Sequence, residues 1–155
     1  METVIYNIDS RHRNTSTYAN PYDFRYKLPN GIKNVTEIKL VSCEFEDFST
    51  CTHLVSYSFL KINDFGSVNH VIKDTTDQTQ LYTDTYFAKV ILPSVAVDPT
   101  PFISTTYKFK QPIDIRNLDI KMYDYQGSYV TTLEDFSLTL EFKTVSNHLL
   151  KQYNE

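Results

Sequence analysis

Two stretches toward the end of the chain alternate strictly between apolar and polar side chains. They are residues 118–124 and residues 136–143. Successive side chains of a β-strand point to opposite faces, so a period of two predicts half-buried strands. We expect the two strands to pair, or nearly pair, antiparallel. Their apolar residues should then share one core: Leu118, Ile120, Met122, Phe136, Leu138, Leu140 and Phe142.

Shorter runs of the same kind recur along the rest of the chain, and no segment has the period of an amphipathic helix. These runs are residues 4–8, 23–28, 35–45, 54–62, 68–72, 86–92 and 106–110. Turn-forming residues separate them, and the three glycines Gly31, Gly66 and Gly127 are each expected in a turn. Eight or nine short strands predict an all-β fold, specifically a two-sheet antiparallel sandwich. Longer links favour Greek-key crossings, as in a single jelly roll.

The 155 residues are expected to form one domain, with a β-sandwich over residues 1–146 and a C-terminal tail over residues 147–155. The polar segment 73–85 is expected to be an irregular loop. In the strand at 35–45, the apolar residues change face after Leu40, which predicts either burial on both faces or a bulge near Leu40 and Val41.

The opening strand runs directly into the polar segment Asp9-Ser10-Arg11-His12-Arg13. Asp and Ser side chains bind backbone groups just ahead of them, which ends a strand. Arg11 and Arg13 lie two residues apart, so an extended backbone would point both guanidinium groups the same way. Three roles remain open for them: intra-chain salt bridges, an anchor on a neighbouring subunit, or a phosphate contact. The net charge of −4 disfavours the phosphate contact and direct nucleic-acid binding.

The chain has 12 Tyr and 10 Phe but no Trp, a composition that suits sheets with contact surfaces. The two cysteines, Cys43 and Cys51, are too few for a disulfide framework and are expected to be reduced, although a bond between them stays open. We expect neither a secretory leader nor a transmembrane segment.

Patterns that would indicate catalysis or metal binding are weak. Cys43 with residues 51–53 (Cys-Thr-His) would supply part of a zinc site, but the remaining ligand has no candidate nearby. Glu44, Glu46 and Asp47 lack the ladder of ligands and the glycine of a calcium loop, so a solvated acidic loop is favoured. No glycine-rich phosphate loop or Gly-x-Ser-x-Gly elbow is present. We therefore predict no enzyme, no cofactor, no metal and no catalytic residue.

Several segments follow one another in an order that is similar to a known family. Asp9-Ser10-Arg11-His12-Arg13 is followed by Asn20-Pro21-Tyr22-Asp23-Phe24, by the Leu-Pro exit at 28–29 and by the strand at 35–45. Residues 59–66, 86–90 and 136–141 continue the series. In this order they resemble the small structural (minor capsid) proteins of nucleocytoplasmic large DNA viruses. The resemblance implies a jelly-roll-like sandwich in an icosahedral capsid, under or between major capsid capsomers, and no catalytic residues.

We therefore expect a viral capsid component that cements or links major capsid capsomers through protein–protein contacts. Its partners would be the major capsid protein and other capsid proteins in a symmetric assembly, within the virion shell after assembly in the host cytoplasm. The expected contact residues are Asp9, Arg11 and Arg13 at the opening segment and exposed tyrosines in loops, namely Tyr18, Tyr22 and Tyr125. Two alternatives remain: a penton protein at the capsid vertices, and a receptor- or carbohydrate-binding β-sandwich.

Overall fold

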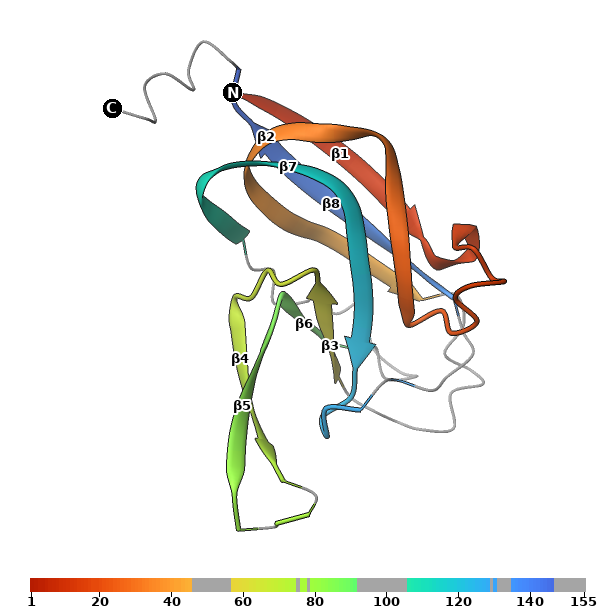
Figure 1. Ribbon diagram of the computed structural model, residues 1–155, viewed down its shortest axis with the longest axis vertical. Helices are drawn as coiled ribbons and strands as arrows, with labels where there is room; N and C mark the ends of the chain where they lie inside the picture. Colours follow the sequence, from red (N-terminus) through yellow and green to blue (C-terminus); the bar gives the residue numbers. More distant parts are fainter. Residues whose placement is uncertain are drawn as a thin grey trace.

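The computed structural model describes residues 1–45, 57–74, 76–77, 79–91, 106–128, 130 and 135–146. The predicted all-β class is confirmed, because strands make up nearly all regular structure in this part of the chain (Figure 1). The elements, in order, are β1 (Glu2–Asp9), the 3-10 turn η1 (Ser10–His12), β2 (Asp23–Phe45), β3 (Tyr57–Ile62), β4 (Val68–Lys73), β5 (Leu81–Tyr86), β6 (Ala88–Ile91), β7 (Thr106–Tyr123) and β8 (Phe136–Thr144).

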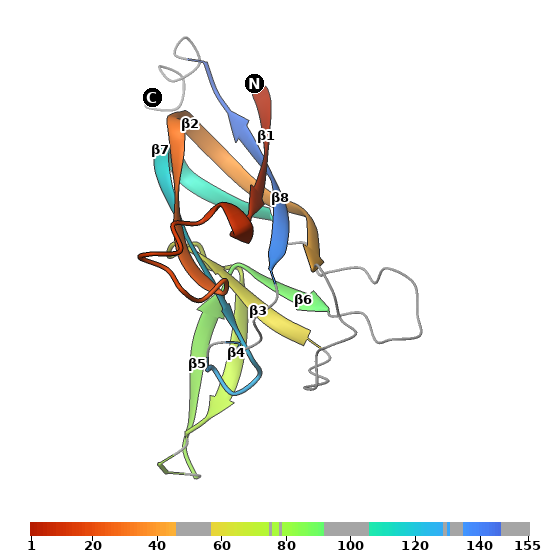
Figure 2. The same cartoon turned by 90° about the vertical axis from the view of Figure 1, so that its right-hand side faces the viewer.

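Six of the strands form one antiparallel sheet in the order β1-β8-β2-β7-β3-β6. Strands β4 and β5 form a separate two-stranded hairpin, which projects from the rest of the molecule in Figures 1 and 2. The observed architecture is therefore a large antiparallel sheet with a small one beside it. This topology establishes the two antiparallel sheets, but it does not by itself establish the expected jelly-roll sandwich.

The large sheet bends because its two longest strands, β2 and β7, bend together (Figure 1). Their pairing slips three times between Lys27 and Glu37, and Gly31 and Asn34 have φ angles of 64° and 55° within this stretch. Extra residues in one strand of a pair produce bulges, which bend a strand and increase its twist. The turn expected at Gly31 is therefore wrong. The chain continues through Gly31 as strand, and the positive φ forms a bulge instead.

The predicted shared core is confirmed, because all seven residues of that prediction belong to one buried cluster. Their strands, however, do not pair with each other. β7 and β8 lie on opposite sides of β2 and are each antiparallel to it, so the direct antiparallel pairing expected between them is wrong. Contacts across the fold close the core at one end, where the ring of Phe136 on β8 lies 5.3 Å from that of Tyr22 and 6.1 Å from that of Phe24.

The bulge alternative for the strand at 35–45 is confirmed. Leu40 pairs with Leu140 and Ser42 with Thr139, which leaves Val41 as the extra residue. Val41 is consequently exposed, while Cys43 beyond the bulge packs against the core.

The expected loop at 73–85 is partly wrong, because residues 81–85 belong to β5 and pair with β4. Polar threonines and tyrosines hide the alternation there, although both residue types favour strands. The strand expected at 86–92 is divided between the end of β5 and β6. The tail at 147–155, the acidic residues 46 and 47, and the Cys-Thr-His segment at 51–53 lie outside the described residues.

Candidate functional site

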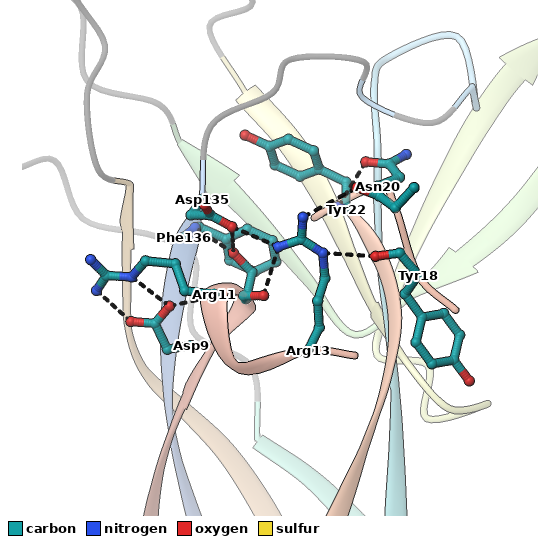
Figure 3. Close-up of polar contacts among 10 residues, drawn as sticks. Asp9, Arg11, Arg13, Tyr18, Asn20, Tyr22, Asp135 and Phe136 are labelled. Atoms are coloured by element: carbon teal, nitrogen blue, oxygen red, sulfur yellow. Dashed lines mark hydrogen bonds and ion pairs between the residues drawn. The ribbon is translucent and has the colours of Figure 1, made fainter. Parts of the chain in front are cut away.

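The polar segment after β1 turns back on itself instead of continuing as strand. Asp9 caps the short turn η1, because its Oδ1 accepts a hydrogen bond of 2.9 Å from the backbone N–H of Arg11. Ser10 is fully buried. Its hydroxyl donates to Oδ1 of Asp135 at 2.7 Å and accepts from the N–H of Phe136 at 3.0 Å (Figure 3). The expected role of Asp9 in ending the strand is confirmed, and Ser10 fastens the turn to the start of β8.

Arg13 connects three segments of the chain from a nearly buried position (Figure 3). Its Nη1 donates to the carbonyl oxygen of Ser10 at 2.7 Å and to Oδ1 of Asp135 at 2.8 Å. Its Nε and Nη2 donate to the carbonyl oxygens of Tyr18 and Ala19 at 2.9 and 3.1 Å. Arg13 thus makes the intra-chain salt bridge that was one of its three open roles, and it holds the loop before β2 against β8.

Arg11 points away from Arg13, so the expectation that both guanidinium groups face the same way is wrong (Figure 3). The η1 turn between them changes the direction of the backbone. The Nε and Nη2 groups of Arg11 donate to the two carboxylate oxygens of Asp9 at 2.9 and 2.6 Å, and its side chain stays 57% exposed. Hydrogen bonding from Arg11 lowers the pKa of the Asp9 carboxyl below its ordinary value.

The three expected contact tyrosines occupy different environments. Tyr18 is half-buried against the core and belongs to the loop that Arg13 holds. Tyr22 is only 2% exposed, so its expected exposure is wrong. It precedes Phe24 by two residues and faces the core with it, stacked on Phe136 (Figure 3). Tyr125 is exposed in the turn after β7, where its carbonyl oxygen lies 2.9 Å from Nε2 of His70 on β4.

The fold therefore brings five of the six expected contact residues to one end of the molecule, and Tyr125 lies apart from them against the β4–β5 hairpin. We call the group formed by Asp9, Ser10, Arg11, Arg13 and Asp135 the arginine cluster. Sequence reasoning missed Asp135 because it lies 122 residues from Arg13. The only available signal was an acidic residue directly before a regular strand.

Apart from the arginine cluster, a groove with a volume of about 730 Å³ lies over the polar face of β2, β7 and β3. Ion pairs join some of its charged groups: Arg25 donates to both carboxylate oxygens of Asp119, and Lys61 lies 3.5 Å from Asp84. Among the described residues, no three His, Cys, Asp or Glu side chains are placed to hold a metal ion.

Comparison with known proteins adds no relative, because neither a scan of protein-family models nor a search of curated proteins finds a match. The part of the chain described by the structure also contains no helix that is both long and apolar enough to span a membrane. The resemblance to minor capsid proteins consequently stays a prediction from the sequence.

Proposed function

We propose that this protein is a structural component of a large DNA virus capsid that links major capsid capsomers by protein–protein contacts. The observation that carries the proposal is the arrangement of the opening motif. The segment on which the sequence resemblance begins makes hydrogen bonds to residues more than 120 positions away, through Ser10 and Arg13. Such bonds fix a surface loop in one shape, and a rigid surface binds a partner at a smaller entropic cost.

The finer fold that we propose is a jelly-roll-like sandwich formed by the bent sheet. Two features support it. The first part of β2 pairs only with β7, whereas the later part also pairs with β8, so the two parts contribute to different regions of the sheet. Apolar residues from both parts, such as Phe24 and Leu40, belong to one buried cluster.

The proposed contact surface is the exposed side of the arginine cluster, with the loop at residues 14–18. Arg11 is its most exposed charged side chain, and the loop beside it is polar and largely exposed. The contact of a single copy is expected to be modest. A symmetric shell repeats it many times, and the repeated contacts together stabilise the assembly.

The first experiment asks whether the protein is a virion component. Mass spectrometry of purified particles should find it in a fixed ratio to the major capsid protein. A reconstruction of the particles should place its density at a symmetry-related position of the shell, under or between capsomers. Absence from purified particles would overturn the proposal. Specific glycan binding by the purified chain would favour the receptor-binding alternative.

The second experiment tests the contact surface with a matched pair of variants. Arg11→Ala removes an ion-paired arginine that is 57% exposed, and Arg25→Ala removes one on β2 that is 54% exposed. Arg25→Ala should keep the stability of the wild type to within about 1 kcal/mol, because both members of its ion pair are exposed. Arg11→Ala should lose about 1–2 kcal/mol, because its partner Asp9 is only 11% exposed, and both variants should remain folded. Particles assembled with the Arg11→Ala variant should contain fewer copies of this chain than particles assembled with the Arg25→Ala variant. Equal incorporation would exclude Arg11 from the contact.

A further inference from the structure

Strand β1 lies at the end of the large sheet, with β8 on one side and no described strand on the other. An edge strand presents a row of unpaired N–H and C=O groups, which can pair with another extended chain. The register of β1 against β8 runs without interruption from Glu2 to Asp9, so the edge is straight over eight residues.

This edge lacks several of the features by which proteins usually prevent edge-to-edge pairing, namely lysine or proline in the strand, a bulge, or a very short strand. Its two charged residues, Glu2 and Asp9, lie at the two ends of the strand. β1 has no Lys, Arg or Pro, and its register has no bulge. The opposite edge strand, β6, is only four residues long and contains Lys89. The first part of β2, which also has an open side, carries Arg25 and Lys27.

The side chains of β1 leave apolar surface uncovered on both faces of the sheet. Val4 and Tyr6 face the core but remain only half-buried, and the ring centroid of Tyr6 lies 6.0 Å from that of Phe142. On the outer face, Ile5 is 60% exposed. A strand added beyond β1 would cover all three side chains.

We infer that this edge pairs with the same edge of a second copy of the chain, antiparallel, about a two-fold axis at Ile5. In that register Ile5 lies opposite Ile5, and Val4 lies opposite Tyr6 on both sides of the axis. A two-fold interface must be complementary to itself, and this strand is. Apolar side chains that are directly opposite stabilise a strand pair. The two charged residues of β1, Glu2 and Asp9, fall opposite Ile8 and Met1, so no like charges face each other.

The pairing makes one sheet that continues through two copies, and it does not depend on a capsid function. Its test is the oligomeric state of the purified full chain. Sedimentation equilibrium over a dilution series should show the mass rising from one chain to two with concentration. Hydrogen exchange of the β1 amides should slow at the same time. A wild-type chain that stays monomeric at every concentration would overturn the inference.

Two lysine substitutions provide the matched comparison. Ile5→Lys should weaken the dimer at least about tenfold, because it places two positive charges opposite each other in place of an apolar pair. Glu141 lies across from Ile5 on β8, so a lysine is compatible with the folded strand. Val71→Lys alters a residue that is 58% exposed on β4 and should leave the dimer unchanged. Equal effects of the two substitutions would overturn the inference.

The register has its own test. Ile5→Lys and Ile5→Glu should each be mainly monomeric, and an equimolar mixture should form a heterodimer, because residue 5 of one copy faces residue 5 of the other. Thermal unfolding of each variant shows that it is folded before mixing. If the mixture stays monomeric while the wild type forms dimers, the two-fold axis does not lie at Ile5.

Discussion

The role of Arg13 leads to the most specific prediction, because one side chain makes four hydrogen bonds, two to the loop before β2 and one each to Ser10 and Asp135. Arg13→Ala removes all four. The bond to the Ala19 carbonyl is exposed, and water replaces it at little cost. The other three are partly buried, and the arginine side chain is only 10% exposed.

The expected loss of stability follows from these contacts. A hydrogen bond to a charged group contributes about 1.5–3 kcal/mol when it is shielded from water, and less near the surface. Asp135 keeps the hydroxyl of Ser10 as a donor in the variant, so its carboxylate is not left unpaired. We therefore expect Arg13→Ala to lower the free energy of unfolding by about 2–4 kcal/mol, out of a typical total of about 5–15 kcal/mol.

Urea unfolding followed by circular dichroism measures this loss, with an unchanged m-value as the sign that the unfolding transition is otherwise the same. Arg13→Lys should lose about 1–2 kcal/mol, because an ammonium group keeps the charge but cannot reach both the carboxylate and the loop carbonyls. Arg25→Ala is the control and should lose less than about 1 kcal/mol, because its ion pair is exposed. A loss from Arg13→Ala no larger than that of the control would refute the assigned role.

Three further predictions concern protonation, reactivity and backbone strain. Hydrogen bonding from Arg11 lowers the pKa of the Asp9 carboxyl below 3.8 in the folded state. The stabilisation that this carboxylate provides is therefore complete above pH 3.8 and is lost as the pH falls through the folded pKa. Asp9→Asn should consequently flatten the decline in the free energy of unfolding at acid pH. Burial raises the pKa of the Cys43 thiol to about 12, although the residue is only partly buried. In a Cys51→Ser background, thiol reagents at pH 8 should therefore label the folded chain at least about tenfold more slowly than the chain unfolded in urea, and equal rates would contradict this. Gly31→Ala should lower the free energy of unfolding by about 1–2 kcal/mol, because φ is +64° at this position and a new Cβ would lie 3.2 Å from a carbonyl oxygen of β7. Urea unfolding measures this loss, and an unchanged midpoint would exclude backbone strain at residue 31.

Of the two strands with the clearest alternation, one was predicted to within one residue at each end, whereas the strand expected at 118–124 is the later part of β7, which also contains the strand expected at 106–110. β8 extends from 136 to 144 against an expected 136–143, and the change of face after Leu40 indicated the bulge that leaves Val41 unpaired. These features are local, because side-chain direction in a strand depends only on position along it. The core was predictable for the same reason.

The pairing of the strands was not predictable in the same way. The segment Pro29-Asn30-Gly31 has the residues of a tight turn, but the same residues also suit a bulge, since Gly31 supplies a positive φ in either case. The choice between them depends on β7, more than 80 residues further along the chain, which pairs on both sides of this point. A strand partner at that separation leaves no trace in the local pattern.

The arginine cluster shows how one motif combines a predictable part with an unpredictable part. The cap by Asp9 is local, and residue types alone indicated it. The different environments of Arg11 and Arg13 depend on Asp135, which reaches the cluster only because β8 pairs with β1 and begins beside η1. Arg13 is consequently committed to holding the chain together, and it is too buried to serve as a main contact for a partner. Of the two arginines, only Arg11 therefore remains a candidate for a charged contact with a partner at this end of the molecule. A double substitution of both arginines would not separate a loss of assembly from a loss of stability.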